Sequence, residues 1–383
     1  LNGSAAIVGA YEHPTRKAEG LSVLRLHADV AKGALADAGL DKSDIDGYFC
    51  AGDAPGLGAL SMVDYLGMKV RHVDTTETGG SSYLVHVAHA AAAIAAGRCN
   101  VALITLAGRP KAEGMAIGTA PRNYGPAPDV PFELPYAPTT VNMYAMAAMR
   151  HMHEHGTTSQ QLAEIAVATR QWAALNPAAT MRGPLSIDDV LASPMISDPL
   201  HLLDACLVTD GGGAVVMTTA EHARAIGHRK PVHVRGYGEA HTHWTIAAMP
   251  DLARLTAAEI AGREAFAMAG VRPDGIDVVE VYDSFTITVL LTLEALGFCK
   301  RGEGGAFVAN QRTAPGGAFP MNTNGGGLSY AHPGMYGIFL LIEAVRQLRG
   351  ECGPRQVQDA ATALVHGTGG TLSSGATCIL STH

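Results

Sequence analysis

A glycine-rich segment near the C-terminus carries the side chains best suited to chemistry in this chain. In residues 322–337 (NTNGGGLSYAHPGMYG) three glycines precede Tyr330 and His332. A histidine fixed on such a turn, just ahead of a helix, can donate to a developing oxyanion or move a proton. A structural histidine in a rigid turn is the alternative interpretation. Gly326 and Gly327 of this turn are candidates for contact with a substrate.

A second glycine-containing segment, residues 77–82 (ETGGSS), leads directly into an alanine-rich helix. Glycine lets the backbone approach a ligand closely, and the start of a helix offers free amides and a positive dipole end. Gly79, Gly80, Ser81 and Ser82 are therefore candidates for binding an oxyanion or holding a nucleophile. Tight packing of the helix on a sheet, with Ser81 or Ser82 as its N-cap, explains the same residues without chemistry.

Two further motifs follow predicted strands. Tyr282 and Asp283, in the run VYDSF, would lie at the C-terminal edge of a strand, where open α/β sheets place their ligands. Asp283 could equally cap the helix that follows. His366 and Gly369, in HGTGG, place a second imidazole on a glycine turn after a strand.

Other histidines form two groups in the sequence, which are His151, His153 and His155, and His241 and His243 beside Trp244. The first group falls at i, i+2, i+4 without an HExxH pattern, and Gly156 follows it, so we interpret it as cations at a helix C-terminus. We expect no metal site at either group. No GxSxG motif supports a serine nucleophile.

The composition excludes several classes of protein. The 383 residues include 27 basic and 35 acidic side chains, a net charge of −8, and are 47% hydrophobic but only 16% charged. Disordered chains combine low hydrophobicity with high net charge, so this chain is not of that class. No run of basic residues exists to bind nucleic acid. No uninterrupted apolar run of about 18 residues predicts a membrane span. Without a signal-peptide pattern or CxxC spacing, the six cysteines indicate reduced thiols and a cytoplasmic location.

Short apolar runs alternate with helical patterns, and this alternation predicts the α/β class. The predicted strands cover residues 5–10, 101–107, 214–218, 276–281, 361–365 and 376–380. The predicted helices cover residues 26–38, 83–96, 158–175, 257–269 and 336–348. Because these strands are apolar on both faces, we expect helices on each side of the sheet.

The chain also repeats itself. A strand with a central glycine (IVGAY), then a helix ending ALADAGLDKSDID, recurs as VRGYG followed by AFAMAGVRPDGID. This predicts a duplicated architecture with halves 1–229 and 230–383. The proline-rich stretch from Arg109 to Asn142 breaks the pattern and opens an inserted loop region of about 109–197. Long loops of this kind usually cover a site, although a flexible surface excursion is the alternative.

Together these segments resemble the thiolase superfamily, in the branch of the sterol carrier protein 2 thiolase domain. The resemblance runs over nearly the whole chain. It is carried by IVGAYE, by GGSS with its helix, by the segments 197–217, 294–308 and 322–357, and by HGTGG. It implies duplicated βαβαβαββ halves stacked as a five-layer αβαβα sandwich, in a homodimer.

One departure from the family bears on the chemistry. Thiolases carry a nucleophilic cysteine at the start of the helix after the first glycine motif, and here Gly80 holds that position, beside Ser81. No cysteine stands near it in the sequence, since Cys50 precedes the region and Cys99 follows the helix. A hydroxyl is a poor substitute without an activating base. Acyl transfer through a covalent intermediate is therefore in doubt.

The other family positions suggest lyase chemistry. His332 matches the histidine of the G-H-P motif, Tyr282 stands where the family has His or Asn, and His366 matches the H-N-x-G histidine with Gly367 in place of asparagine. A related branch without the cysteine cleaves β-hydroxyacyl-CoA thioesters by a retro-aldol reaction. Those aldolases move protons with tyrosines and pair with an OB-fold protein of the DUF35 type. The tyrosines in suitable segments are Tyr237, Tyr282, Tyr330 and Tyr336.

Three functions therefore stay open at this point. The first is an acyl-CoA C–C lyase, the second a thiolase that uses Ser81 or an unaligned cysteine, and the third a non-catalytic acyl-CoA or lipid-binding subunit. In each, coenzyme A enters as part of the substrate and no other cofactor is expected. Because the net charge is negative, local cations must hold the CoA phosphates. Arg109, Lys111 and Arg122 are the candidates in the inserted region.

Overall fold

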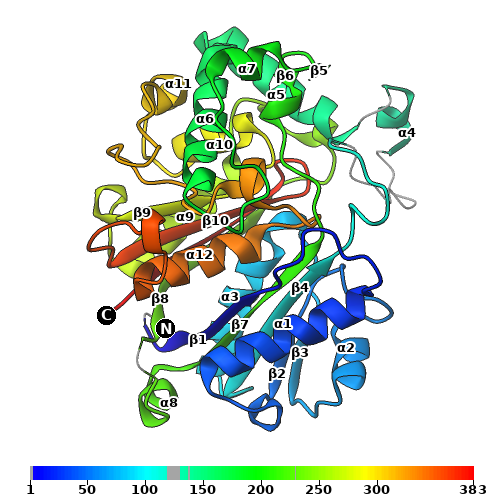
Figure 1. The fold of residues 1–383 in the computed structure, drawn as a ribbon, viewed down its shortest axis with the longest axis vertical. Helices are drawn as coiled ribbons and strands as arrows, with labels where there is room; N and C mark the ends of the chain where they lie inside the picture. Colours follow the sequence, from blue (N-terminus) through cyan, green and yellow to red (C-terminus); the bar gives the residue numbers. More distant parts are fainter. Residues whose placement is uncertain (1–2, 119–129, 137–138, 229) are drawn as a thin grey trace.

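A nine-stranded mixed sheet forms the centre of the computed structural model, which describes residues 3–118, 130–136, 139–228 and 230–383 (Figure 1). The strands follow one another across the sheet in the order β3-β2-β4-β7-β1-β8-β11-β10-β9. Their bounds are β1 Ala5–Glu12, β2 Gly47–Phe49, β3 His72–Asp74, β4 Val101–Gly108, β7 Gly211–Thr219, β8 Val232–His241, β9 Val278–Val281, β10 Thr362–Gly369 and β11 Ser374–Ser381. A separate hairpin pairs β5 (Met195–Ser197) with β6 (Leu200–His201).

Twelve α-helices within the described residues surround the sheet. They are α1 Val23–Ala38, α2 Ala59–Leu66, α3 Ser82–Ala95, α4 Val130–Glu133, α5 Thr140–His155, α6 Ser159–Ala174, α7 Ile187–Ala192, α8 Ala220–Ala225, α9 Thr256–Ala269, α10 Thr286–Ala295, α11 Gly304–Val308 and α12 Gly337–Arg349. None of these described helices is both long and apolar enough to cross a lipid bilayer.

The two halves of the sheet have the same strand order, so the predicted duplicated α/β fold is confirmed. In the first half β3, β2 and β4 run parallel, and β7 and β1 continue the sheet antiparallel. In the second half β9 and β10 run parallel, and β11 and β8 continue antiparallel. A parallel bridge between Val279 and Met321 stands in the place of β3. The pairs Ala6–His233 and Ile7–Val232 join the halves, and the predicted boundary falls between α8 and β8.

The repeat extends to the packing of helix on strand. A Cβ atom on Gly9 of β1 would lie 2.2 Å from the carbonyl oxygen of Ala34 on α1. A Cβ on Gly236 of β8 would lie the same 2.2 Å from the carbonyl oxygen of Ala265 on α9. Glycine at these two strand positions lets each helix approach its strand more closely than any side chain would permit. These are the glycines of the repeated IVGAY and VRGYG runs.

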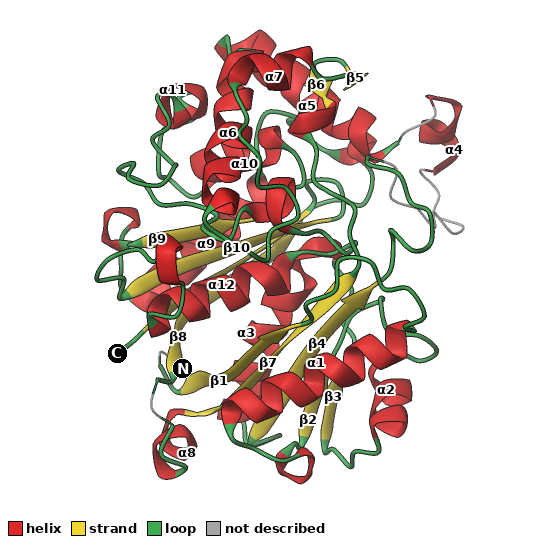
Figure 2. Ribbon diagram, viewed as in Figure 1, coloured by secondary structure: helices red, strands yellow, loops and turns green. Residues whose placement is uncertain are grey.

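Three apolar clusters separate five layers of secondary structure (Figure 2). The outer cluster of the first half packs α1 and α2 on one face of β1, β2, β4 and β7. The central cluster packs α3 and α12 between the facing sides of the two half-sheets. The third cluster packs α9 and α10 on the outer face of the second half-sheet. These layers are the predicted αβαβα arrangement.

The inserted region is more helical than the sequence predicted, since α6 agrees with the predicted helix over 158–175 while α5 and α7 fall where a loop was expected. Most of residues 139–197 is helical, since α5, α6 and α7 each begin at a side chain that caps the first turn. Thr139 supplies the N-cap of α5. This helix was not predicted, because the proline-rich stretch before it indicated an irregular segment up to residue 142. Although the insertion belongs to the first half in sequence, α5 and α6 pack into the outer cluster of the second half. The prolines at 121, 126, 128 and 138 lie outside the described residues.

The predicted helix end at His151–His155 is confirmed, because α5 ends at His155 with Gly156 in the left-handed conformation. His151 is buried, with its Nε2 3.1 Å from a carboxylate oxygen of Glu294. Throughout the described ranges, no three His, Cys, Asp or Glu side chains converge as metal ligands would.

A buried cluster of polar and charged side chains connects β9 to α12. Arg355 contacts both carboxylate oxygens of Glu343, at 2.9 and 3.0 Å. The Thr323 hydroxyl lies 2.8 Å from an oxygen of Glu343 and 2.8 Å from an oxygen of Glu280. Burial, together with the nearby Glu343 carboxylate, holds the pKa of Glu280 well above its usual range. Burial thus favours the neutral form of Glu280 beside the ion pair of Arg355 with Glu343.

We predict that Arg355→Gln destabilises the fold by about 3–5 kcal/mol, because it leaves the buried Glu343 carboxylate without its cation. Urea unfolding followed by circular dichroism measures this change. Arg272→Gln is the control, because Arg272 and its partner Asp274 are both exposed and such pairs contribute about 0–1 kcal/mol. Equal losses in the two variants would contradict the prediction.

Candidate functional site

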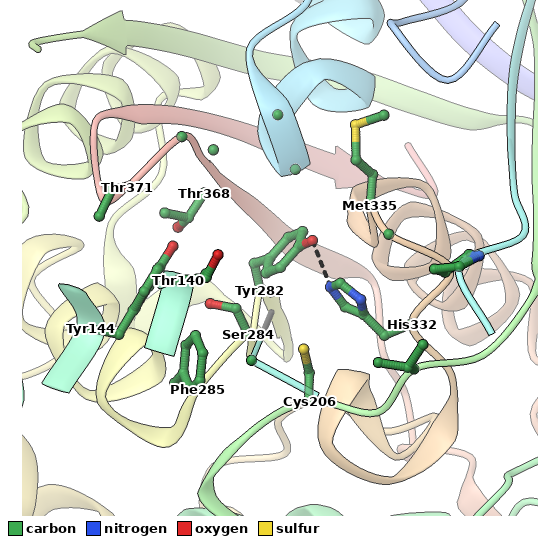
Figure 3. A pocket seen from close by; sticks show the side chains of 18 of the residues that line it. Thr140, Tyr144, Cys206, Tyr282, Ser284, Phe285, His332, Met335, Thr368 and Thr371 are labelled. Atoms are coloured by element: carbon green, nitrogen blue, oxygen red, sulfur yellow. Dashed lines mark hydrogen bonds between the residues drawn. The ribbon is translucent and has the colours of Figure 1, made fainter. Parts of the chain in front are cut away.

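A cavity of about 340 Å³ opens where the two halves meet the inserted region. Its walls come from the start of α3, the end of β10, the loop after β4, α5 and the segment before α12 (Figure 3). Most lining side chains are apolar, among them Met115, Leu207, Phe285 and Met335. The rings of Tyr144 and Phe285 pack with centroids 4.6 Å apart and form one wall. The cavity therefore suits an apolar acyl group next to a few polar atoms.

The polar centre of the cavity is a phenol bonded to an imidazole. The hydroxyl of Tyr282 lies 2.8 Å from Nε2 of His332, and both side chains line the cavity (Figure 3). Burial lowers the pKa of His332 to about 4 and holds the pKa of Tyr282 well above its usual value. Near neutral pH both groups are uncharged. When Nδ1 carries the imidazole proton, Nε2 accepts the proton of the phenol.

The backbone and ring of His332 are both held in place. Its amide donates to the Thr209 hydroxyl at 2.9 Å, and the Thr209 amide donates back to the His332 carbonyl at 3.1 Å. Tyr336 stacks on the imidazole, with an interplanar angle of 21°. The Tyr336 hydroxyl donates to Asn324 at 2.9 Å. Tyr336 is the N-cap of α12, but it does not line the cavity, so it supports His332 and does not face a substrate.

The glycines before α3 lie against the same phenol. Gly79 and Gly80 line the cavity, and a Cβ on Gly80 would lie 2.4 Å from Cε2 of Tyr282. The room for a side chain at position 80 is therefore filled by the tyrosine ring. A Cβ on Gly79 would lie 2.8 Å from the amide nitrogen of Gly370, so α3 and the end of β10 meet backbone to backbone.

The two serines of this motif turn away from the cavity. Ser81 is fully buried and its Oγ lies 2.8 Å from Oγ of Ser374. Ser82 is also buried and its hydroxyl donates to the Gly79 carbonyl at 2.7 Å. Neither side chain lines the cavity or caps α3. Ser81, predicted as a nucleophile, and Ser82, predicted at the substrate, therefore lie outside the cavity.

Asp283 neither lines the cavity nor caps α10, and its carboxylate instead holds the glycine turn before His332. Its carboxylate accepts the amides of Gly327 at 2.7 Å and Leu328 at 3.1 Å. Burial raises the pKa of Asp283 to about 7. A Cβ on Gly326 would lie 2.0 Å from this carboxylate, so glycine is required at that point of the turn. Gly326 and Gly327 thus form the turn before His332, and neither of these predicted substrate contacts lines the cavity.

Three other predicted residues lie outside the cavity. Tyr330 is buried and donates to the carboxylate of Glu12, with the Arg16 guanidinium 4.7 Å from its ring centroid. Tyr237 lies on β8 and packs at the edge of the central cluster. His366 is inside β10 and not on a turn, because the strand continues to Gly369. Its Nδ1 lies 2.8 Å from the hydroxyl of Thr377, and burial lowers the pKa of His366 to about 3.

Several cavity residues escaped the sequence analysis. Cys206 lines the cavity on the side of the Tyr282–His332 pair away from α3 (Figure 3). Burial and the nearby Asp283 raise the pKa of the Cys206 thiol, so it is neutral and not activated as a nucleophile. Tyr144 and Trp244 also line the walls. Cys206 lies in the segment 197–217 that carries the family resemblance, and this was the signal that could have placed it at the site.

Among the described residues, the lining contains no lysine or arginine. Arg109 and Lys111 flank Pro110, which does line the cavity, but neither side chain reaches it. Arg122 lies outside the described residues. The proposed cations for the CoA phosphates therefore do not face the described walls.

Comparison with known proteins gives the same family over the whole chain. Residues 238–382 match the family model "Thiolase C-terminal domain-like". An acetyl-CoA acetyltransferase of Methanothermobacter thermautotrophicus is 32% identical and covers 98% of this chain and 99% of its own. The 17-hydroxy-3-oxo-4-pregnene-20-carboxyl-CoA lyase of Mycobacterium tuberculosis is 36% identical and covers 91% of this chain and 92% of its own.

A solved structure described as an Ltp2-ChsH2(DUF35) aldolase superposes with a TM-score of 0.90 and 31% sequence identity. It covers all of this chain and 98% of its own. The two relatives above 30% identity cover nearly the full length, so the sequence comparison and the structural comparison give the same family. The chain belongs to the thiolase superfamily, in the branch related to sterol carrier protein 2.

Proposed function

We propose that this protein cleaves the Cα–Cβ bond of a β-hydroxyacyl-CoA by a retro-aldol reaction. The observation that carries the proposal is the Tyr282–His332 pair, which stands against Gly80 where a thiolase would place its nucleophile. The names of the similar lyase and aldolase support the same reaction. A degraded lipid, steroid or aromatic acid would supply the acyl group.

The reaction needs a proton removed from the β-hydroxyl. In our proposal the Tyr282 oxygen takes this proton while the phenol passes its own proton to Nε2 of His332. The Cα–Cβ bond then breaks, its electron pair forms the thioester enolate, and a ketone or aldehyde leaves. The imidazolium returns its proton through the Tyr282 hydroxyl to Cα of the enolate, so the pair is restored and the products are a carbonyl compound and a shorter acyl-CoA. The relay replaces a free phenolate by an imidazolium that faces the developing enolate, so the charges in the apolar cavity form in opposite pairs.

The glycines provide the second half of the chemistry. Gly79, Gly80, Gly369 and Gly370 all line the cavity, at the meeting of α3 with β10. Backbone amides at this point would stabilise the negative charge on the thioester oxygen as the enolate forms. Coenzyme A is part of the substrate in this scheme, and no other cofactor takes part.

We further propose that a DUF35-type OB-fold protein completes the enzyme. The similar aldolase structure names such a component. Since the described cavity lining has no cation for the CoA phosphates, a partner could provide it.

We also propose that the protein is a homodimer in the cytoplasm. The dimer is supported by exposed apolar side chains at one edge of the sheet, since edge strand β3 carries the exposed Val73, and Leu57, Leu60 and Tyr65 are exposed nearby in sequence. The cytoplasmic location is supported by the six cysteines, which are all free thiols.

The experiment that tests the function is a cleavage assay with β-hydroxyacyl-CoA substrates that carry a tertiary β-carbon. The protein is assayed alone and with a DUF35-type partner, and carbonyl release and acyl-CoA shortening are followed by mass spectrometry. Cleavage supports the proposal. Tight acyl-CoA binding without any cleavage, with or without the partner, would instead favour a binding subunit.

We predict that Tyr282→Phe and His332→Ala each lower kcat by about 10²–10⁴-fold, the usual contribution of a proton-transferring side chain. Steady-state kinetics measure this effect, and KM should change less than kcat. Tyr330→Phe is the matched control, because Tyr330 is equally buried but bonds to Glu12 outside the cavity. A control as slow as Tyr282→Phe would contradict the assignment.

We predict that the acid limb of kcat/KM that belongs to His332 lies well below neutral pH, separate from any step near pH 7 that belongs to Asp283, whose pKa burial raises to about 7. The pKa of His332 is lowered to about 4, so its Nε2 loses the ability to accept a proton only as the pH approaches that value. Circular dichroism at each pH separates this loss from unfolding. An acid limb at the ordinary histidine pKa of about 6.5 that persists in Asp283→Asn would show that a different group limits the reaction.

We predict that acetyl-CoA leaves no covalent adduct on the protein. The cavity side of Gly80 has no nucleophile, Ser81 points away, and the Cys206 thiol is neutral. Intact-mass spectrometry after incubation checks this. An acetyl adduct that disappears in Cys206→Ala would favour thiolase chemistry, which the similar acetyl-CoA acetyltransferase represents.

A further inference from the structure

The space between Gly80 and Tyr282 decides which reaction this cavity can perform. A Cβ on Gly80 would lie 2.4 Å from Cε2 and 2.6 Å from Cζ of Tyr282. Real Cβ atoms do not approach other atoms so closely. The two ring atoms flank or carry the phenol hydroxyl, so the clash falls on the end of the ring that bonds to His332.

The ring cannot move aside without losing its function. Tyr282 is buried, and its neighbours on the other sides are the rings of His332 and Tyr336, at centroid distances of 5.7 and 5.9 Å. Tyr336 in turn stacks on Phe339 at 5.5 Å. Because these rings fill the central layer on that side, the free volume open to a displaced phenol is the cavity itself. Any side chain at position 80 therefore pushes the hydroxyl away from Nε2 of His332.

A second wall restricts position 80 from the side of the sheet. The same Cβ would lie 2.6 Å from the carbonyl oxygen of Thr368 on β10. This oxygen belongs to the backbone and cannot rotate away. The backbone of Gly80 itself is not in the left-handed region, so its glycine is required by space and not by conformation.

We infer that Gly80 and Tyr282 are a mutually exclusive pair that sets the reaction type. A nucleophile at position 80 and a proton-relaying phenol at position 282 compete for one volume, so the cavity can hold only one of them. This inference deepens the proposed function, on which its catalytic consequence rests, and it makes Gly80 a specificity-determining position for the lyase reaction.

A double-mutant cycle on stability tests the pair without any substrate. Gly80→Ala is made in the natural background and in Tyr282→Ala, and urea midpoints are measured for all four proteins. We expect a much smaller fall of the midpoint in the Tyr282→Ala background, because the ring no longer opposes the methyl group. The contact with the Thr368 carbonyl is present in both backgrounds and cancels. Equal falls would overturn the inference.

Gly275→Ala is the matched control in both backgrounds. Gly275 also lies outside the left-handed region, and a Cβ there would have no atom within 4 Å. Its substitution should leave the midpoint unchanged in each.

Activity gives the second readout. Gly80→Ala should lower kcat as far as Tyr282→Phe, and the combined variant should lose no more than either alone, because both changes remove the same relay. Full activity of Gly80→Ala would overturn the inference. If the natural protein cleaves no β-hydroxyacyl-CoA, the proposed function fails, while the stability cycle still decides whether the two positions exclude each other.

Discussion

The Tyr282–His332 hydrogen bond is the interaction around which the site is arranged. It joins the end of β9 to the glycine turn before α12, and so it fixes two segments 50 residues apart in the chain. Tyr282 is buried, His332 is half-buried, and both are neutral; the described residues of the cavity lining include no charged side chain. Proton movement within a neutral pair is the chemistry that such an apolar cavity can support.

The surrounding structure keeps this pair in one geometry. Thr209 fixes the backbone of His332 from both sides, Tyr336 covers the face of the imidazole, and Asp283 holds the glycine turn by two amides. Asp283 follows Tyr282 directly in β9's continuation, so the same short segment supplies the phenol and the anchor for its partner's loop. The run VYDSF thus supplies both the Tyr282 phenol that lines the cavity and the Asp283 carboxylate that holds the loop of its hydrogen-bond partner.

Much of the fold was predictable because its patterns are local. The apolar runs of β1, β4, β7, β10 and β11 and the helical periods of α1, α6, α9 and α12 agree with the structure. The repeated glycine runs predicted the duplication, and Gly9 and Gly236 make equivalent contacts. The site was predicted only in part, since Tyr282, His332 and Gly80 do meet while Ser81, Tyr330 and His366 face elsewhere. Which way a buried side chain points depends on tertiary packing, and Tyr144 reaches the cavity from a helix that the proline-rich stretch before it did not predict.

The course of the inserted region has a consequence for how the molecule assembles. Helices α5 and α6 are made before residue 230, yet the apolar surface that they cover belongs to α10 and the strands of the second half. More than a hundred further residues must be synthesised after α6 before α10 is available, and only then can these helices bury their apolar faces. The cavity wall formed by α5 is thus completed only when the second half of the chain has been made. A truncated chain would expose the apolar faces of α5 and α6 and would lack a complete cavity.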